Sequence, residues 1–446
     1  MSHSLRSSGF LASVFTVAGG TAVAQAVALA ALPALTRLYP PEAYGAFVVF
    51  LAWGGFVLPL VCARFEVAVA LPRRAASASA LVVGSLAVAT AVALACAVAV
   101  MAVLAWRPAL AGFGLAWLPL YVFLGGAVQV FSNWAARVQD FRRLAVSRVL
   151  QAAVTAGLSI GGALVLGAQP VVLVVATVAG QLTALALLAP GLPASGFRAR
   201  MPARRVQRLL RHFRPLAAFN GPHVLSDAAQ TSGLPLLLTS AFGPQAAAYY
   251  AFTSRLLKAP LGLVSGAISQ VYYPRAATQR GDDARLREEA LRILRVSSLA
   301  ALALLPMLLL VPDALYAWAF GAAWQEVGSF VRALAPWVLS AFVAAPLSVL
   351  YLVKERFGLD FALSLGATVL AFALLGAGMI AGLGLLGSMW LLSLGMTAYI
   401  IGSTVFEFTV VIARPGKVAA SSASSASVAA SVAASASSSP SEERRR

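Results

Sequence analysis

Two basic residues, Arg255 and Lys258, lie within a long apolar stretch of the chain. Their spacing of three residues places them on one face of a helix. A charge at the depth of a bilayer costs at least roughly 2.5–3.5 kcal/mol, so such residues usually face a cavity or a partner on another helix. The pair therefore predicts an anion-binding site in a water-filled cavity. The alternatives are snorkelling to an interface or pairing with an acidic neighbour.

Asp227 is the nearest candidate for that acidic neighbour, because it lies near the middle of the preceding apolar stretch. It could neutralise Arg255 or Lys258, or carry a coupling proton. The triplet Asn220–Gly221–Pro222 predicts an interruption of the same helix, and broken polar helices commonly line a transport path. Other polar residues in this stretch are His223, Ser226, Gln230, Thr231 and Ser232.

Further candidates lie close to the ends of other apolar stretches. Arg64 and Glu66 are two residues apart, so on one helix they should point in different directions, each towards another partner or water. An interfacial position explains them as well as a substrate role does, and the same holds for Glu407. Gln25 and Gln230 occupy matching places in the two halves, where a buried amide either holds helices together or contacts sugar hydroxyls.

Motifs for catalysis, nucleotide hydrolysis and metal binding are absent from the sequence. No G-x-x-x-x-G-K-[ST], H-E-x-x-H or G-x-S-x-G pattern occurs, which removes a built-in ATPase and argues against an enzyme. The three histidines are scattered, and Cys62 and Cys96 lie in apolar stretches where a thiol acts as a small hydrophobe. We predict no metal or cofactor, with proton or sodium coupling left open.

The elements that carry these residues are predicted to be membrane-spanning helices. Hydrophobic residues make up 60% of the chain and charged residues 11%, whereas soluble proteins contain about 25% charged residues. Helix is the only open-ended form that satisfies its own backbone in lipid. Twelve runs are long enough to span. They cover approximately residues 10–32, 43–63, 78–105, 115–135, 145–166, 170–190, 216–239, 247–272, 296–318, 328–352, 361–381 and 384–412.

The basic residues fix the orientation of these spans. With the N-terminus inside, 28 of the 33 Lys and Arg residues fall on the cytoplasmic side and three, Arg37, Arg107 and Arg332, on the other. The positive-inside rule therefore places both termini in the cytoplasm. The same rule accounts for the net charge of +18, so we expect no nucleic-acid partner.

A weak internal repeat divides the chain into two halves. An offset of 205 residues pairs Ala24–Gln25 with Ala229–Gln230, Tyr44 with Tyr249, and Phe47 with Phe252. Six spans separate the copies, so the halves run the same way, and repeats of this kind are typical of transporters. The predicted divisions are an N-terminal lobe (1–195), a basic linker (196–214), a C-terminal lobe (215–413) and a disordered Ser/Ala-rich tail (414–446).

Several segments resemble bacterial polysaccharide (Wzx-type) flippases. The clearest are residues 35–45 (LTRLYPPEAYG), residues 64–72 (RFEVAVALP), Ser132–Asn133–Trp134 with the basic segment Arg137–Arg148, and the stretch from Phe242 to Pro274. This family is part of the multidrug/oligosaccharidyl-lipid/polysaccharide exporter superfamily. The resemblance covers most of residues 10–275, and the pattern of spans extends it to about residue 412.

The resemblance implies two six-helix lobes around a central cavity that is often cationic. It also implies flipping of undecaprenyl-diphosphate-linked oligosaccharide across the bacterial inner membrane, with Arg255 and Arg64 at positions where the family tends to carry Arg. Partners would be membrane lipids, a polysaccharide polymerase and glycosyl transferases. The runners-up are a cation-coupled drug exporter or lipid II flippase of the same superfamily, and a membrane glycan polymerase or ligase. A drug exporter for cations should line its cavity with acids, whereas the deep charges here are mainly basic.

Overall fold

The protein is almost entirely helical. The computed structural model describes residue 16 and residues 18–194, 196–279 and 282–411, and within these ranges it contains helices and turns but no strand. Among these described residues, ten helices are long and apolar enough to cross a membrane. The expected all-α, multi-pass membrane architecture is therefore confirmed for the described part of the chain.

The two remaining spans of the predicted twelve correspond to α10 (Ala203–Phe242) and α11 (Pro244–Thr278). At 1.5 Å per residue, their 40 and 35 residues reach about 60 Å and 52 Å, well beyond the roughly 30 Å of a hydrocarbon core. They are absent from the ten apolar helices because polar and charged residues recur along both, so neither contains an uninterrupted stretch that is apolar enough. The candidate site residues Asp227, Arg255 and Lys258 lie on these two helices.

The N-terminal bundle contains six spans. The first covers Ala18–Leu38, and its last part is α2 (Leu32–Leu38). The others are α3 (Pro41–Val57), α5 (Ala75–Trp106), α6 (Leu118–Arg137), α7 (Phe141–Leu166) and α8 (Pro170–Leu188), with the short α4 (Phe65–Ala68) and α9 (Gly191–Ala194) at one end.

The C-terminal bundle continues from α10 and α11 through four more spans. They are α12 (Asp283–Leu310), α14 (Val327–Ala344) with α15 (Val349–Val353), α16 (Phe357–Ile380) and α17 (Gly384–Phe406). The short α13 (Asp313–Phe320) follows α12 at the opposite end from the basic loops. A π-helical turn, Glu407–Val411, extends α17.

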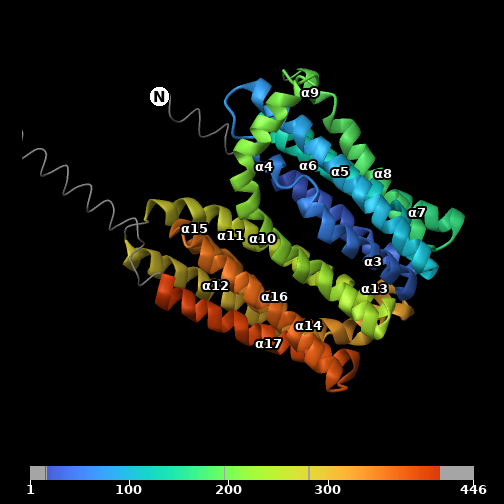
Figure 1. Ribbon diagram of the computed structural model, residues 1–446. Helices are drawn as coiled ribbons and strands as arrows, with labels where there is room; N and C mark the ends of the chain where they lie inside the picture. Colours follow the sequence, from blue (N-terminus) through green and yellow to red (C-terminus); the bar gives the residue numbers. More distant parts are fainter. Residues whose placement is uncertain (1–15, 17, 195, 280–281, 412–446) are drawn as a thin grey trace, which may run out of the picture.

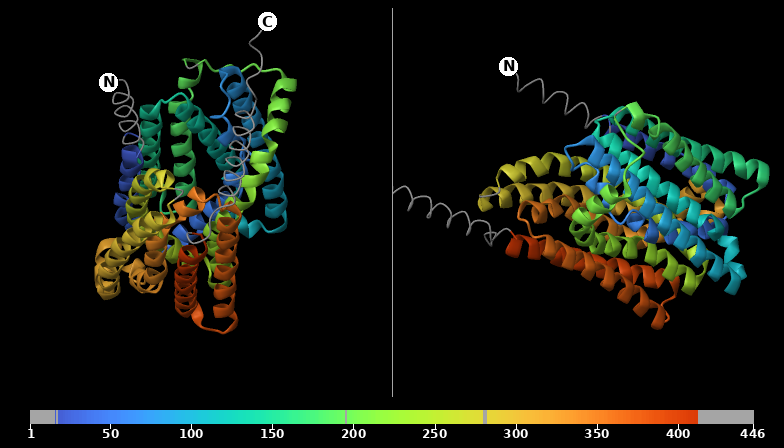
Figure 2. Two further views of the ribbon diagram at one scale, coloured as in Figure 1. Left: turned by 90° about the vertical axis from the view of Figure 1, so that its left-hand side faces the viewer. Right: turned by 45° about the horizontal axis from the view of Figure 1, so that its top comes forward.

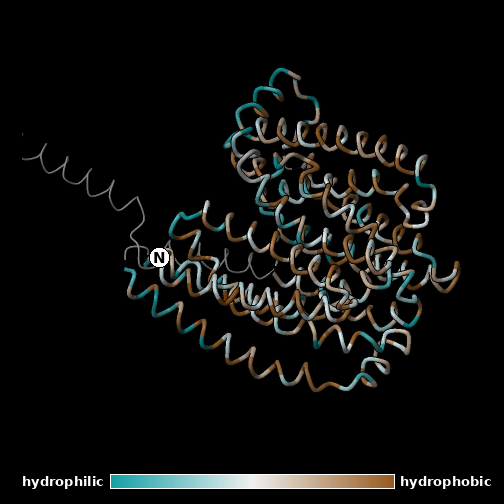
Figure 3. The backbone as a smooth tube through the Cα atoms, turned by 60° about the horizontal axis from the view of Figure 1, so that its bottom comes forward, coloured by the Kyte–Doolittle hydropathy of each residue, from teal (hydrophilic) through white to brown (hydrophobic). Residues whose placement is uncertain are grey.

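The two bundles lie side by side and are joined through α10 (Figures 1 and 2). They meet near α13 and separate towards α9, α12 and α15, the end that carries most of the basic loops. The backbone is hydrophobic along the middle of the helices and hydrophilic mainly towards their ends (Figure 3). Large apolar side chains such as Leu164, Val165 and Ile380 are exposed, as expected of surfaces that face lipid rather than water.

Matching turns in the two bundles support the predicted parallel repeat. Gln139 (φ 61°) and Glu355 (φ 53°) are both left-handed, and each lies between the fourth and fifth spans of its bundle. One residue later, the amide of Asp140 donates to the carbonyl of Ala135 (2.9 Å), and the amide of Arg356 donates to that of Tyr351 (2.8 Å). Both bonds span five residues and end the preceding helix in the same way.

The predicted interruption at Asn220–Gly221–Pro222 is wrong, because α10 runs unbroken through it with Pro215, Pro222 and Pro235 inside. Neighbouring helices in a membrane protein can compensate for the backbone bond that each proline removes. Here α10 packs on α5 at its start and on α3 and α16 further along. Residues 203–214 of the expected linker are the first turns of this helix. The predicted domain boundaries stay predictions, and the tail at 414–446 lies outside the described residues.

Candidate functional site

Arg255 and Lys258 lie in the middle of α11, about 17 Å and 21 Å along its axis from Pro244. Both side chains are exposed, so neither is sealed in a helix seam. Within the described ranges, no carboxylate lies within salt-bridge distance of either cation. Because α11 packs against α3 of the other bundle as well as α10 and α14 of its own, the two cations lie on a helix between the bundles.

Lys258 contacts the aromatic ring of a tryptophan on a neighbouring helix. Its Nζ lies 4.9 Å from the centroid of Trp337 on α14, a cation–π contact. Trp337 is buried, with 5% of its surface exposed, and its backbone amide donates to Ser393 Oγ (3.2 Å). The Lys258 side chain is exposed, although α11 packs against helices of both bundles. A pattern of sequence spacing could not reveal this pair, since 79 residues separate its members.

Asp227 does not pair with the α11 cations, so the interpretation that it neutralises Arg255 or Lys258 is wrong. Its carboxylate lies 3.8 Å from His223 Nδ1 and accepts a hydrogen bond from Ser364 Oγ (3.3 Å). His223 Nε2 is in turn 3.4 Å from Asp360 Oδ2. One imidazole therefore lies between two aspartates, one on α10 and one on α16. Asp360 and Ser364 were missed because they are more than 130 residues away in the sequence.

Arg64 and Glu66 form an ion pair, so the prediction that they point apart is also wrong. Arg64 Nη1 lies 3.2 Å from Glu66 Oε1. The prediction assumed one continuous helix, whereas α3 ends at Val57 and the chain reverses through left-handed Ala63 (φ 47°) and Arg64 (φ 63°) before α4. Two non-glycine residues in this conformation cost about 1–3 kcal/mol each, which the surrounding packing must hold in place.

Two polar atoms of the Arg64–Glu66 pair have no hydrogen-bond partner among the described residues. Glu66 is buried, at 2% exposed, and its Oε2 has no hydrogen-bond partner; the Nε of Arg64 is buried and unpartnered too. Burial raises the pKa of the Glu66 carboxyl above its ordinary value of 4.5, against the lowering effects of a backbone hydrogen bond and the Arg64 charge. A buried carboxyl with a raised pKa and a free oxygen is suited to taking up a proton.

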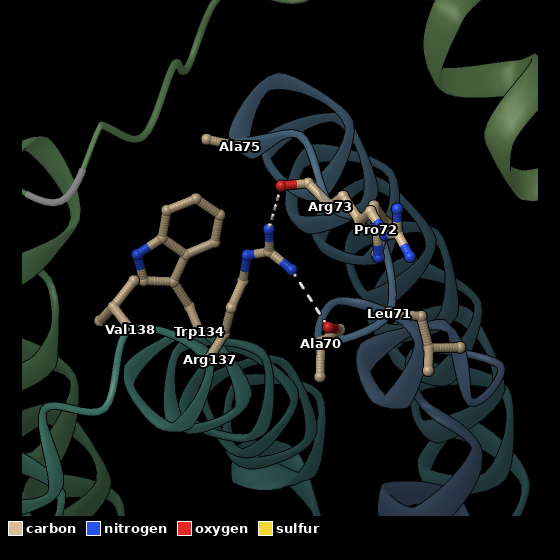
Figure 4. Close-up of a pocket in the computed structure, with 8 residues that line it drawn as sticks. All are labelled: Ala70, Leu71, Pro72, Arg73, Ala75, Trp134, Arg137 and Val138. Carbon is tan, nitrogen blue, oxygen red and sulfur yellow. Dashed lines mark hydrogen bonds between the residues drawn. The ribbon is translucent and has the colours of Figure 1, made fainter. Parts of the chain in front are cut away.

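Arg137 holds the segment that follows this pair (Figure 4). Its guanidinium donates to the carbonyls of Val69 (3.2 Å), Ala70 (3.1 Å) and Arg73 (3.4 Å), so it fastens the turn between α4 and α5 to the end of α6. The cavity beside it, of about 480 Å³, is lined by Trp134, Arg73 and the same turn. Because the donors of Arg137 face backbone carbonyls, we read this residue as structural, a support for the position of Arg64 and Glu66.

Within the described residues, the remaining predicted residues make no hydrogen bond or ion pair with these groups. Gln25 and Gln230 are half-buried, and the Nε2 of Gln230 is buried without a partner. Glu407 is 4% exposed with an unpartnered Oε1. Within the described part of the chain, no hydrogen bond or ion pair joins Arg255 or Lys258 to another predicted site residue. The geometry thus gives three separate polar groups: the α11 cations, the His223 cluster and the Arg64–Glu66 pair.

The bundles are closed at the end opposite the basic loops by one aromatic cluster. The indole of Trp324, which is fully buried, lies 5.5 Å from the ring of Tyr44 and 5.9 Å from that of Tyr249, both edge-on, and 4.9 Å from that of Phe252. Its Nε1 donates to the carbonyl of Tyr39 (3.1 Å). The repeat-related residues Tyr44 and Tyr249 thus meet at one indole, and we call these five residues the Trp324 cluster.

Two further contacts close the same end of the molecule. Arg37 of the first bundle donates to the carbonyl of Trp318 in the second (2.8 Å). Gly45 of α3 lies against the carbonyl of Pro244 at the start of α11, so closely that a side chain there would collide with it. The arrangement is therefore tight at this end, whereas the bundles diverge at the other (Figure 1).

Solved transporter structures have the same fold. An inward-facing multidrug resistance MATE family transporter of the MOP superfamily is 16% identical, with a TM-score of 0.69, covering 89% of this chain and 94% of that one. The lipid II flippase MurJ in an inward closed conformation is 11% identical, with a TM-score of 0.65 and 89% coverage of both chains. An outward-facing MATE family transporter is 15% identical and has a lower TM-score of 0.59, covering 90% and 94%.

A search among curated proteins gives no match. A family model described as "polysaccharide biosynthesis protein" matches residues 34–329, about two thirds of the chain. That range includes both left-handed residues before α4, the whole of α10 and α11, and the Trp324 cluster. On this match, and with a fold shared with the MOP-superfamily transporters, the chain belongs to the polysaccharide biosynthesis protein family.

Proposed function

We propose that this protein is a flippase that moves undecaprenyl-diphosphate-linked oligosaccharide repeat units across the bacterial inner membrane by alternating access. Its products would serve O-antigen or exopolysaccharide synthesis. The family description supports a role in polysaccharide biosynthesis, and the shared fold with a lipid II flippase supports a lipid-linked glycan as cargo. A polysaccharide polymerase and glycosyl transferases would be its functional partners.

The observation that carries the proposal is the pair of cations on α11. Arg255 and Lys258 share one face of a helix between the bundles, are accessible, and have no acidic partner among the described residues. Keeping two such charges in a span is costly unless something negatively charged meets them. A diphosphate carries matching charge, and charge-assisted contacts to phosphate are strong where water and salt screen poorly.

The shape of the molecule suits the loading step of this cycle. The bundles are closed by the Trp324 cluster and diverge towards the basic loops, which the positive-inside rule places in the cytoplasm. Lipid-linked precursors would enter there and reach Arg255 and Lys258. Arg64, at the same end, would contribute a third cation near the entrance, while Gln25 and Gln230 would contact the glycan or its neighbouring helices.

Coupling would use acidic groups that are separate from the two α11 cations. With no nucleotide-binding motif, the driving force would be a proton or sodium gradient, the gradient of the substrate itself, or a partner. Asp227 is the first candidate, because His223 lies between its carboxylate on α10 and that of Asp360 on α16. Glu66 is the second, because its buried carboxyl binds a proton more readily than an exposed one. Glu407 is the third.

The test replaces both α11 cations with alanine. In cells that carry Arg255→Ala/Lys258→Ala at confirmed membrane levels, we expect surface polysaccharide to fall at least tenfold and the lipid-linked precursor to accumulate in the cytoplasmic leaflet. Two buried charge-assisted contacts of about 1.5–3 kcal/mol each are enough for that loss. Arg255→Lys/Lys258→Arg keeps the charge and should retain part of the export.

The matched control removes two exposed arginines outside the proposed path. Arg208→Ala/Arg287→Ala makes the same change in net charge on α10 and α12 and should leave export near the wild-type level. Normal export in the α11 double variant would remove the anionic-cavity proposal. Equal loss in both double variants would show a general dependence on basic residues and would equally count against it.

A cation-coupled drug exporter is the second candidate, and the exposed Asp227–His223–Asp360 group favours it. This group could bind a cationic compound directly instead of a coupling ion. In that case Asp227→Asn would abolish efflux of a cationic dye, whereas the α11 double variant would leave it unchanged. Dye efflux that survives both changes would exclude this candidate site.

A further inference from the structure

A cavity of about 410 Å³ lies between α11 and α12 at the basic end of the C-terminal bundle. It is far from the proposed substrate site, because Arg275 on its wall is 17 residues beyond Lys258, about 26 Å along α11. One wall is apolar, formed by Ile268, Val271 and Ile293. Besides Arg275, the charged residues that line the cavity are Glu289 and Arg292 on α12. The cavity therefore joins an apolar surface to charged groups.

The charge at this cavity is positive and unpaired. Arg275 and Arg292 are both exposed, and within the described ranges neither guanidinium makes a hydrogen bond or ion pair. Of the two carboxylate oxygens of Glu289, Oε1 accepts a hydrogen bond from Gln279 Nε2 (3.0 Å). Two arginines and one glutamate leave a net charge of +1, which matches the single negative charge of a phosphodiester.

Unsatisfied polar atoms gather behind the same wall. Tyr272 lines the cavity and is 2% exposed, yet its hydroxyl has no hydrogen-bond partner; Gln279 Oε1 and Glu289 Oε2 are buried and unpartnered as well. Most buried polar groups in proteins are hydrogen-bonded, and exceptions call for an explanation such as an unplaced water, ion or ligand. Three such atoms in one place point to a site whose hydrogen bonding is completed by an occupant.

The surroundings suit a lipid rather than a soluble anion. Along α11 and α12 towards the middle of the helices, large apolar side chains next to the cavity are exposed: Val264 at 50%, Val271 at 56%, Val296 at 60% and Leu299 at 67%. In a membrane-spanning bundle these surfaces meet acyl chains. The arginines lie at the basic end of both helices, where the phosphates of the cytoplasmic leaflet are expected. An occupant with an apolar tail and a phosphate fits both parts.

We propose that this cavity binds one anionic glycerophospholipid of the cytoplasmic leaflet. Its phosphodiester is held by Arg275 and Arg292, and its acyl chain lies along Ile268, Val271 and Ile293. A headgroup with hydroxyls, such as that of phosphatidylglycerol, offers donors to the carboxylate of Glu289, which lines the cavity. The bound lipid then links α11 to α12, two consecutive helices that make few direct contacts with each other at the level of the backbone.

The experiment uses the full-length protein in detergent and native mass spectrometry with added phosphatidylglycerol or phosphatidylcholine. We expect one phosphatidylglycerol molecule to bind at least tenfold more tightly to the wild type than to Arg275→Ala/Arg292→Ala. Arg287→Ala/Arg295→Ala removes two exposed arginines of α12 that do not line the cavity, and should bind like the wild type. Phosphatidylcholine should bind more weakly to all three.

Other outcomes overturn the proposal. Equal loss in the two double variants would mean that the basic surface as a whole attracts the lipid. Binding of inorganic phosphate as tightly as phosphatidylglycerol would mean that the apolar wall plays no part. If the arginine variant fails to fold, Val271→Trp fills the apolar wall with both arginines intact and should also lose the lipid. Arg255→Ala/Lys258→Ala should bind phosphatidylglycerol like the wild type. The result of this test therefore does not depend on the flippase proposal.

Discussion

Charged side chains in this protein are distinguished by whether they have partners. Arg64 and Glu66 form an ion pair, and His223 lies between two aspartates, whereas Arg255 and Lys258 have no acidic partner among the described residues. A paired charge near lipid needs no further explanation, because its partner offsets part of the desolvation cost. Unpaired cations remain as the residues that most need a ligand.

Glu66 gives a prediction about pH. Burial raises the pKa of its carboxyl, so the folded protein binds this proton more tightly than the unfolded chain does. The resulting stabilisation is fully present below the ordinary value of 4.5 and is lost as the pH rises through the raised value. Glu66→Gln stays neutral at every pH. The thermal midpoint of the wild type should therefore fall relative to that of Glu66→Gln as the pH rises across this window.

Glu288→Gln is the control for this measurement, because Glu288 is exposed on α12. Its difference from the wild type should stay constant over the same pH range. A Glu66→Gln difference that is equally flat would show that folding does not change the proton affinity of Glu66 and would remove it from the coupling candidates.

At the scale of elements, the break between α3 and α4 decides where the second span ends and where Arg64 points. The 3-10 turn Leu58–Leu60 follows α3, and two left-handed residues then reverse the chain. Arg137 fastens the segment after α4 through three carbonyls. The family-like stretch at 64–72 is therefore a rigid turn held by a second helix, not the continuation of a span.

Ala63→Gly tests how much strain this turn contains. Ala63 has φ 47°, where a side chain costs about 1–2 kcal/mol and glycine costs little. We expect the variant to be more stable by about 1 kcal/mol, measured as a rise in the thermal midpoint of roughly 1–3 °C. Ala80→Gly, inside α5 and fully buried, should lower the midpoint instead. A destabilised Ala63→Gly would show that this backbone is not strained.

At the scale of the whole molecule, the Trp324 cluster joins the two bundles at one end. Tyr39 and Tyr44 come from the N-terminal half, whereas Tyr249, Phe252 and Trp324 come from the C-terminal half. If the bundles move between states that open at one end or at the other, these contacts exist only while this end is closed. Loss of a fully buried tryptophan side chain costs about 3–5 kcal/mol. Even 1.4 kcal/mol of difference between the two states changes their ratio tenfold.

Trp324→Ala should therefore favour opening at this end. Ala46 lies near the start of α3 and is 8% exposed, so an Ala46→Cys label site is protected in the closed form. With Cys62 and Cys96 replaced by serine, Trp324→Ala should raise the rate of labelling at position 46 by a membrane-impermeant maleimide about tenfold. Trp318→Ala is the control, because the Trp318 side chain is 74% exposed and only its carbonyl contacts Arg37.

An unchanged labelling rate in a folded Trp324→Ala protein would show that the cluster does not hold this end closed. A similar rise in Trp318→Ala would point to general loosening of the loop between α12 and α14. Either result would leave the proposed roles of Arg255 and Lys258 untouched, since they lie further along α11.

The sequence alone determined the membrane class, the order and approximate extent of the spans, the two matching halves and the family. These features follow from local properties: the length of apolar runs, the distribution of basic residues and short motifs such as those at 35–45 and 64–72. The repeat pairs Tyr44 with Tyr249 and Phe47 with Phe252 were visible for the same reason. That Arg255 and Lys258 lie at mid-span also followed from the sequence, because a hydropathy pattern places them there.

Only the tertiary structure decided which groups meet. Asp227 pairs with His223 and Ser364 instead of the α11 cations, Lys258 lies at Trp337, and Arg64 turns back to Glu66. Each of these contacts depends on an angle or on packing between helices that are far apart in the chain. An ion pair forms only where two charged groups come within contact distance of each other. A hydropathy pattern contains no information about the direction of side chains. The closure of one end by Trp324 likewise comes from the placement of two bundles, which no single span encodes.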